Sequence, residues 1–178
     1  MQLGDNGTLY TPESLIEIYR EQLLPLATIV TPNSFEAELL TGLPCVTLEH
    51  GATACKALQS VGASDVIITS IDTSQTIALV GLSASTTDEG FYIEVPKHEQ
   101  YFGGTGDLLA GLLLAHVAKS PDNLACAAAR AVGSVQAVIA RTIELRRETG
   151  RSESGLQLVA SREMIMQPPE VQCHPLSA

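Results

Sequence analysis

The pattern of hydrophobic and polar positions predicts alternating helices and strands. Apolar residues recur at helical spacing in five segments, and each segment is bounded by a capping residue, a proline or a glycine. Short apolar runs rich in β-branched residues separate these segments and predict strands. The predicted helices cover about residues 11–23, 34–40, 50–61, 103–119 and 121–148, and the predicted strands cover residues 26–30, 65–70, 76–82 and 91–95.

The order of these elements predicts an α/β fold with a mostly parallel sheet, because strands and helices alternate along the chain. The polar loop at residues 83–90 joins two strands directly, so that pair is predicted to form a hairpin. Residues 1–150 are predicted to form one domain, and residues 151–178 a polar tail with one short ordered piece at 156–159. A sheet of about four strands leaves apolar edges that need cover, so the chain is expected to be part of a larger α/β unit.

Composition and charge exclude several classes of protein. The chain has 178 residues, of which 45% are hydrophobic and 17% charged, so it is expected to be globular. Its formal net charge is −10 and it shows no basic stripe, so no nucleic-acid partner is expected. No apolar run reaches the ~18 residues of a membrane span and the first residues lack a secretory signal, so a cytoplasmic protein without a membrane partner is expected. The four cysteines and four histidines show no zinc-binding spacing, which predicts reduced thiols and no metal cluster.

A glycine-rich loop, Gly-Gly-Thr-Gly-Asp at residues 103–107, is the most informative segment for chemistry. Gly104 and Gly106 allow a positive φ and a close approach of a ligand, and the loop leads into a helix N-terminus that attracts anions. Thr105 adds a hydroxyl donor. Asp107 falls in the first helical turn, where a carboxylate can take the proton of an alcohol that attacks a phosphoryl group. The alternative is a plain loop with an aspartate helix cap.

Two better-known phosphate-binding motifs do not match this loop. It has no lysine followed by serine or threonine at the spacing of a P-loop. It also lacks the third glycine of a Rossmann dinucleotide site. The sequence therefore excludes a P-loop and a Rossmann site here, and leaves the choice between another kind of anion site and a plain capped loop open.

Polar residues also follow two predicted strands, at the edge where open α/β sheets bind ligands. Asn33 and Glu36 come after the first strand and are interpreted either as ligand-binding groups or as the cap and dipole partner of the next helix. Thr69 and Ser70 end the following strand, where two hydroxyls suit phosphate or ribose contacts. These four residues are expected to share one edge of the sheet.

Two other groups of polar residues are given structural roles. Residues 4–7 have the composition of a turn, and spacing alone supports no metal or phosphate role for Asp5. Four arginines lie near the end of the last long helix, where their charge suits the negative pole of the helix dipole: Arg141, Arg146, Arg147 and Arg151. They are not assigned to a phosphate clamp.

Four stretches of the chain together resemble pyridoxal kinases of the ribokinase-like superfamily. They occur in that family's order and with similar gaps, and they read GDNGTLYTPE (4–13), TPNSFEAELLTG (31–42), VIITS (66–70) and GGTGDLLAGLLLA (103–115). The resemblance implies a ribokinase-like three-layer α/β/α fold. It further implies that this chain is truncated: it corresponds to the C-terminal, nucleotide-binding part and lacks the N-terminal strands and the lid.

The resemblance also implies an activity and a set of site residues. Pyridoxal kinases transfer the γ-phosphate of ATP to the 5′-hydroxyl of pyridoxal, pyridoxine or pyridoxamine, which salvages vitamin B6 as pyridoxal 5′-phosphate, and they use Mg²⁺ and a monovalent cation, K⁺ or Na⁺. The implied catalytic base is Asp107, and the implied anion hole is Gly104, Thr105 and Gly106. The other implied residues are Asn33, Glu36, Thr69, Ser70, Thr105 and Tyr10 for ATP, Asp5 and Thr31 for the monovalent cation, and Glu36 for Mg²⁺.

Three interpretations of function stay open from the sequence. The first is a pyridoxal kinase-like phosphotransferase, working as a homodimer or with a full-length kinase, or inactive as a truncated form. The second is a non-catalytic fragment that binds nucleotide or pairs with a full-length kinase. The third is a kinase of another small alcohol in the same superfamily, which a panel of substrates would separate from the first.

Overall fold

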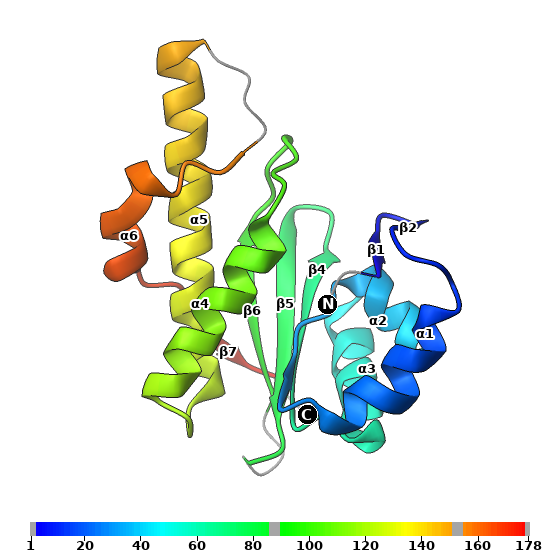
Figure 1. Cartoon of the computed structure of the whole chain (residues 1–178). Helices are drawn as coiled ribbons and strands as arrows, with labels where there is room; N and C mark the ends of the chain where they lie inside the picture. The colour runs from blue at the N-terminus through cyan, green and yellow to red at the C-terminus, as the bar shows by residue number, and fades with distance from the viewer. Residues whose placement is uncertain (1–2, 86–89, 151–154, 177–178) are drawn as a thin grey trace. The chain divides into compact units, whose positions relative to one another are not determined.

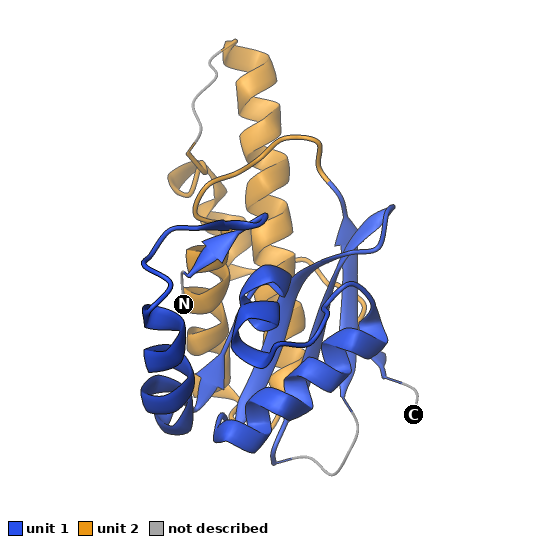
Figure 2. Ribbon diagram, turned by 90° about the vertical axis from the view of Figure 1, so that its right-hand side faces the viewer, with its two compact units in different colours: residues 1–97, 174–178 blue, residues 98–173 orange. Residues whose placement is uncertain are grey.

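The computed structural model describes residues 3–85, 90–150 and 155–176 of the chain (Figure 1). The chain divides into two compact units: unit 1 comprises residues 1–97 and 174–178, and unit 2 comprises residues 98–173 (Figure 2). Unit 1 holds the sheet and the helices of the first half of the chain, and unit 2 holds two long helices and a short one.

Unit 1 begins with a tight hairpin. β1 (Gly4–Asp5) pairs antiparallel with β2 (Thr8–Leu9), and Asn6 and Gly7 between them have φ angles of 48° and 78°. Two successive left-handed residues make the turn whose twist matches that of paired strands, and Asn-Gly is its preferred sequence. The turn predicted at residues 4–7 is confirmed.

The first predicted helix starts later than expected. α1 covers Leu15–Ile18, a π-helical turn continues over Tyr19–Leu23, and a 3₁₀ turn follows at Leu24–Leu26. The prediction of Thr11 as the cap is wrong, because the cap position is Ser14, which makes no side-chain hydrogen bond to the helix. Tight backbone turns occupy the segment before α1, so the helical conformation begins about one turn further along the chain.

Five strands form the sheet of unit 1: β3 (Ile29–Val30), β4 (Asp65–Asp72), β5 (Thr76–Ser83), β6 (Phe91–Pro96) and β7 (His174–Pro175), in the order β3-β4-β5-β6-β7. β3 pairs parallel with β4 and the other pairings are antiparallel, so the prediction of a mostly parallel sheet is wrong for the described residues. A parallel pair needs a long crossover, which α2 (Ser34–Thr41) and α3 (Leu48–Val61) supply between β3 and β4. The short connections from β4 to β5 and from β5 to β6 permit only antiparallel pairing.

The last strand, β7, is not among the predicted elements. It pairs with the start of β6, where the rings of Tyr92 and His174 stack with their centroids 5.1 Å apart. Two residues of a proline-containing tail show no alternating pattern, so no sequence signal marks this strand. The predicted hairpin of β5 and β6 is confirmed, and residues 86–89 of its loop lie outside the described part of the chain.

The helices α2 and α3 pack on the sheet and close the core of unit 1. Gly42 ends α2 with a φ of 72°, as its sequence position predicts, and the Thr47 hydroxyl accepts the His50 N–H at the start of α3. A Cβ on Gly51 would come within 2.6 Å of the Ile71 side chain and 3.2 Å of the Val80 side chain, so glycine there lets α3 approach the sheet without a shift of these side chains. The largest fully buried side chains of this core include Leu40, Leu58, Val66, Ile68, Ile71 and Val80.

All four cysteines are free thiols. Burial raises the pKa of Cys45 to about 11, with a smaller contribution from the negative charge of Glu38. Burial likewise raises the pKa of Cys55 to about 12. Both thiols stay protonated at neutral pH and act as small apolar residues of the core.

Unit 2 is built around two long helices, both of which the sequence predicts. α4 (Thr105–Lys119) packs along α5 (Leu124–Thr149). Phe102, Val135 and Ile139 form a buried cluster with partly buried leucines of α4 packed against it. The packing of the two helices therefore also fixes the chain just before α4, where Phe102 lies.

Residues 155–173 belong to unit 2 and pack beside α5. A 3₁₀ turn (Val159–Ser161) and a short helix, α6 (Arg162–Met166), extend beyond the single ordered piece that the sequence predicts for the tail. A Cβ on Gly133 of α5 would lie 2.2 Å from the Pro169 carbonyl oxygen. Glycine at position 133 therefore lets the backbone of this segment touch the helix.

Among the described residues, α5 is long and apolar enough to cross a membrane. However, 61% of its most apolar 18-residue window is buried within the protein. Mostly buried apolar helices are typical of protein cores, so α5 is weak evidence for a membrane span.

Candidate functional site

The carboxyl ends of β3 and β4 lie side by side, because the two strands are parallel. Just beyond them a further bridge pairs Asn33 with Thr69, whose N–H donates to the Pro32 carbonyl oxygen at 2.8 Å. The Ser34 hydroxyl donates to the Ser70 carbonyl oxygen at 3.1 Å. The structure therefore brings Asn33, Thr69 and Ser70 together at one edge of the sheet.

Ser70 has a backbone conformation that no sequence pattern indicates. Its φ is 62°, and the register of β4 against β5 shifts between Ile68 and Ile71. Non-glycine residues in the left-handed region store strain and are concentrated at functional sites. The irregularity leaves Ser70 exposed and out of the regular ladder, two residues before β4 ends at Asp72, so the expectation that Thr69 and Ser70 end this strand is wrong.

Asn33 and Glu36 form a capping box that also holds the first hairpin. Asn33 Oδ1 accepts the Glu36 N–H at 2.8 Å, and Glu36 Oε2 accepts the Asn33 N–H at 3.0 Å. Glu36 Oε1 accepts the Leu3 N–H at 2.7 Å, and Asn33 Nδ2 donates to the Gly4 carbonyl oxygen at 2.8 Å. Glu36 is only 2% exposed, so its carboxylate serves the fold, and its roles toward ATP and Mg²⁺ stay predictions.

The other predicted residues of unit 1 lie on or near the first hairpin. Asp5 Oδ1 accepts the Asn6 N–H at 2.9 Å, and the Tyr10 N–H donates to the Leu3 carbonyl oxygen at 2.9 Å. The Tyr10 residue is 60% exposed, and Thr31 is half-buried directly after β3. The roles assigned to these residues toward the nucleotide and the monovalent cation stay predictions.

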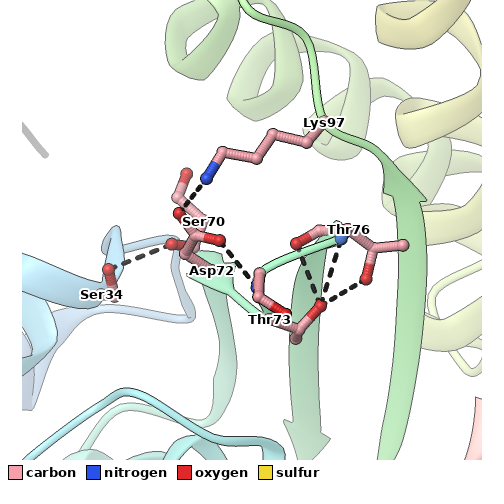
Figure 3. A network of polar contacts seen from close by, with 7 residues as sticks. Ser34, Ser70, Asp72, Thr73, Thr76 and Lys97 are labelled. Atoms are coloured by element: carbon pink, nitrogen blue, oxygen red, sulfur yellow. Dashed lines mark hydrogen bonds and ion pairs between the residues drawn. The ribbon is translucent and has the colours of Figure 1, made fainter.

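A polar network surrounds the end of β4 (Figure 3). Lys97 forms an ion pair with Asp72, whose Oδ1 also accepts the Ser74 N–H at 3.0 Å. The Thr73 hydroxyl donates to the Thr76 carbonyl oxygen at 3.1 Å and closes the turn into β5. No sequence pattern indicates this network, because the two charged residues are 25 positions apart and each alone resembles an ordinary solvated charge.

We expect Lys97→Met to raise the pKa of Asp72. The hydrogen bond from Lys97, followed by that from the Ser74 N–H, holds this pKa below its ordinary value. A lowered pKa in the folded state contributes stability above the unfolded pKa, and that contribution is lost as the pH falls through the folded value. NMR titration of the Asp72 carboxyl carbon measures the change, with Lys119→Met as the control. An unchanged titration in Lys97→Met would show that the ion pair is not formed in solution.

In unit 2, the glycine loop opens α4 as the sequence predicts. Gly104 occupies the cap position with φ 86° and ψ 5°, a left-handed conformation that favours glycine. Thr105 begins the helix, and Asp107 is its third residue. Asp107 is therefore not the N-cap residue itself, and its role as a base stays a prediction.

The backbone of this loop is open to a ligand. Among the described residues outside the loop's own neighbours, no heavy atom lies within 4 Å of a Cβ placed on Gly103, Gly104 or Gly106. The first-turn N–H groups and the positive end of the helix dipole favour an anion at this position. The exposed Asp107 lies in the same turn, so the predicted anion site and a carboxylate are adjacent in unit 2.

The predicted residues thus fall into two sets. Unit 1 joins Asn33, Glu36, Thr69 and Ser70 through backbone and side-chain contacts. Unit 2 holds residues 104–107 in a single helical turn. Each set is assembled by the local packing of its own unit.

Comparison with known proteins gives a consistent assignment along the chain. The family model described as phosphomethylpyrimidine kinase matches residues 3–153. A pyridoxal kinase of Arabidopsis thaliana is 42% identical over 173 residues, which cover 93% of this chain and 56% of the relative. The pyridoxal kinase of Homo sapiens is 37% identical over 157 residues, which cover 80% of this chain and 50% of the relative. The chain spans about half the length of these curated relatives.

Solved pyridoxal kinases share the fold of this chain. The Leishmania donovani enzyme in complex with ADP and pyridoxine matches with a TM-score of 0.87 at 30% identity, over 98% of this chain and 60% of that one. The same enzyme with ADP and ginkgotoxin matches with a TM-score of 0.86 at 31% identity and the same coverage. The expected ribokinase-like α/β fold is thereby confirmed. On the strength of the family match and of these identities, the chain belongs to the phosphomethylpyrimidine kinase family, among the pyridoxal kinases.

Proposed function

We propose that this chain is an ATP-dependent kinase that phosphorylates the 5′-hydroxyl of pyridoxal, pyridoxine or pyridoxamine. The observation that carries the proposal is the start of α4, where the left-handed Gly104 caps the helix and Asp107 follows in its first turn. Relatives named pyridoxal kinase, and solved structures with ADP and pyridoxine or pyridoxamine, support the choice of substrates.

In the proposed reaction, Asp107 accepts the proton of the substrate alcohol as its oxygen attacks the γ-phosphorus of ATP. The bond from that phosphorus to the bridging oxygen breaks, and ADP leaves with the electron pair. The N–H groups at Gly104, Thr105 and Gly106 stabilise the negative charge on the transferred phosphoryl oxygens. Products are a phosphate ester and ADP, and the abstracted proton passes from Asp107 to solvent.

For the nucleotide, we assign contacts to the residues at the sheet edge of unit 1. Ser70 is exposed and strained, and Thr69 lies beside it on the bridge to Asn33. Hydroxyl and amide groups in such a place suit phosphate and ribose oxygens. Tyr10, largely exposed near the first hairpin, is assigned to the same nucleotide.

We also assign residues of unit 1 to the two cations. Among the described residues no group of three His, Cys, Asp or Glu side chains can hold a metal ion by itself. Mg²⁺ in kinases is held through one or two carboxylates together with the phosphates of the substrate, and it neutralises their charge. Each Glu36 oxygen accepts one backbone N–H and keeps a second lone pair, which suits a cation held through water. Asp5 and Thr31 would supply oxygen ligands to K⁺ or Na⁺.

A second candidate function is pairing with another kinase chain, as a homodimer or with a full-length kinase. It is favoured by β3, a two-residue strand at the edge of the sheet whose described pairing is with β4 alone. Exposed strand edges are templates for further pairing. Light scattering of the chain alone and mixed with a full-length pyridoxal kinase tests this candidate, and a monomer in both samples contradicts it.

Whether or not the chain pairs with another kinase chain, we propose that it is located in the cytoplasm.

The proposed activity is tested by incubating the purified chain with ATP, Mg²⁺, K⁺ and each of the three vitamers. Formation of the 5′-phosphate is followed by mass spectrometry, and ADP binding by calorimetry. Hydroxymethylpyrimidine is the comparison substrate, because the matching family model is named for a pyrimidine kinase. Phosphorylation of a vitamer supports the proposal. Failure to bind ADP, in a sample shown to be folded, contradicts it.

A further inference from the structure

The segment that leads into the glycine loop is irregular, and α5 holds it at three points. His98 Nε2 and Gln136 Oε1 are 3.2 Å apart, and Gln100 Oε1 accepts a hydrogen bond from Arg146 Nη1 at 3.2 Å. Phe102 is 6% exposed and lies against the Arg146 guanidinium, whose Cζ is 4.7 Å from the ring centroid. The segment is therefore attached to one helix along its whole length.

These contacts come from one stripe of α5. Gln136, Ile139, Ile143 and Arg146 are spaced three or four residues apart, so they share a face of the helix. Ile139 is buried against Phe102, and Ile143 packs at the edge of the same cluster. Arg146 is the cationic member of a face that is otherwise apolar or neutral.

Stability alone does not explain an arginine at this position. The Nε and Nη2 atoms of Arg146 are buried and have no hydrogen-bond acceptor among the described residues. The guanidinium gains one neutral acceptor and the π face of Phe102, and it loses the hydration of its other donors. An apolar side chain of similar length would fill the space without that loss.

Phe102 connects Arg146 to the anion loop. The Phe102 carbonyl oxygen accepts the Thr105 hydroxyl at 3.4 Å, with two glycines, Gly103 and Gly104, between the two residues. Glycine pairs are conformationally free, so the position of the loop depends on what holds its two ends. The helix α4 holds one end, and Phe102 beneath Arg146 holds the other.

We infer that Arg146 is a positioning residue for the anion loop, which it holds in place through Phe102 and Gln100. The inference rests on the proposed kinase function, because it gives that loop its catalytic meaning. Donors aimed at a transferred phosphoryl group accelerate the reaction only while they stay aligned. Loss of Arg146 therefore lowers kcat and leaves the KM for ATP nearly unchanged.

The test compares three variants of the whole chain. Arg146→Met keeps the packing against Phe102 and removes the charge and the hydrogen bond to Gln100. Arg146→Lys keeps the charge, and Arg147→Met is the control on an exposed neighbour. Hydrogen exchange of the peptide over residues 102–108 reports on the loop directly. Thermal unfolding reports on stability, and ADP binding and turnover report on function.

We expect Arg146→Met to be at least as stable as the parent, to exchange about tenfold faster in the loop and to lose about tenfold in kcat. We expect Arg146→Lys to show loop exchange and a kcat between those of Arg146→Met and the parent. Arg147→Met should match the parent in both. Equal exchange in the two methionine variants overturns the inference, and so does an unchanged kcat in Arg146→Met. If the parent itself binds no ADP, the proposed function fails instead, and the exchange data alone decide whether Arg146 holds the loop.

Discussion

Replacing Asp107 by alanine is expected to lower kcat by roughly 10²–10⁴-fold, the usual contribution of a general base. The affinity for ADP should change little, because the loop N–H groups that face the anion stay in place. Asp107 is exposed in the first turn of α4, so the substitution leaves no cavity. Steady-state assays with pyridoxal, together with calorimetric titration of ADP, measure the two effects separately.

Two further variants test whether the loss of turnover is due to the basicity of the Asp107 carboxylate. Asp107→Asn keeps the shape of the side chain and removes its basicity, so it should be as inactive as the alanine variant. Asp122→Ala removes another exposed aspartate, from the turn before α5, and should behave like the parent. Turnover within a few-fold of the parent in both Asp107 variants would exclude this residue as the base.

Glu36→Gln is expected to destabilise the fold by about 2–3 kcal/mol. The two Glu36 oxygens accept the N–H groups of Leu3 and Asn33, and the residue is almost completely buried. A glutamine places an NH₂ group against one of these donors, so one buried N–H loses its acceptor. Urea unfolding followed by circular dichroism measures the change, which should appear as a lower midpoint.

The matched control for this prediction is Glu49→Gln. Glu49 also lies in the first turn of a helix, α3, but it is exposed. Its substitution should alter the stability by less than about 0.5 kcal/mol. Equal midpoints for the two glutamine variants would mean that the Glu36 carboxylate does not carry the contacts described.

Local signals account for the parts of the fold that sequence analysis predicts correctly. Asn33 and Gly42 mark the two ends of α2. The Asn33 side chain accepts a backbone N–H at the start of the helix, and Gly42 adopts the left-handed conformation at its end. Whether neighbouring strands pair parallel or antiparallel depends on the length of the connection between them. The prediction of a mostly parallel sheet is wrong because short turns join β4 to β5 and β5 to β6. The strand β7 depends on pairing with a distant partner, so its own two residues carry no signal.

In the candidate site, too, local sequence patterns predict some residues, and contacts between distant residues go unpredicted. Glycine spacing predicts the loop at residues 103–107. The predicted end of a strand indicates Thr69 and Ser70, although β4 continues to Asp72. The pairing of Lys97 with Asp72 and the contact of Arg146 with Phe102 join residues far apart in sequence, so composition and spacing cannot indicate them. We infer that Arg146, a charge near a helix end, serves a neighbouring loop as well as the helix dipole.

The path of the chain makes unit 2 an insertion between two adjacent strands of unit 1. The chain leaves unit 1 after Lys97, beyond β6, and returns at His174, at the start of β7. Unit 2 is thus doubly tethered, and releasing it by proteolysis takes two cuts. A deletion that begins at His174 would turn this double tether into a single linker and would expose the backbone of β6 that β7 now covers. Expression designs should therefore keep residues 174–176 and attach any C-terminal tag beyond them.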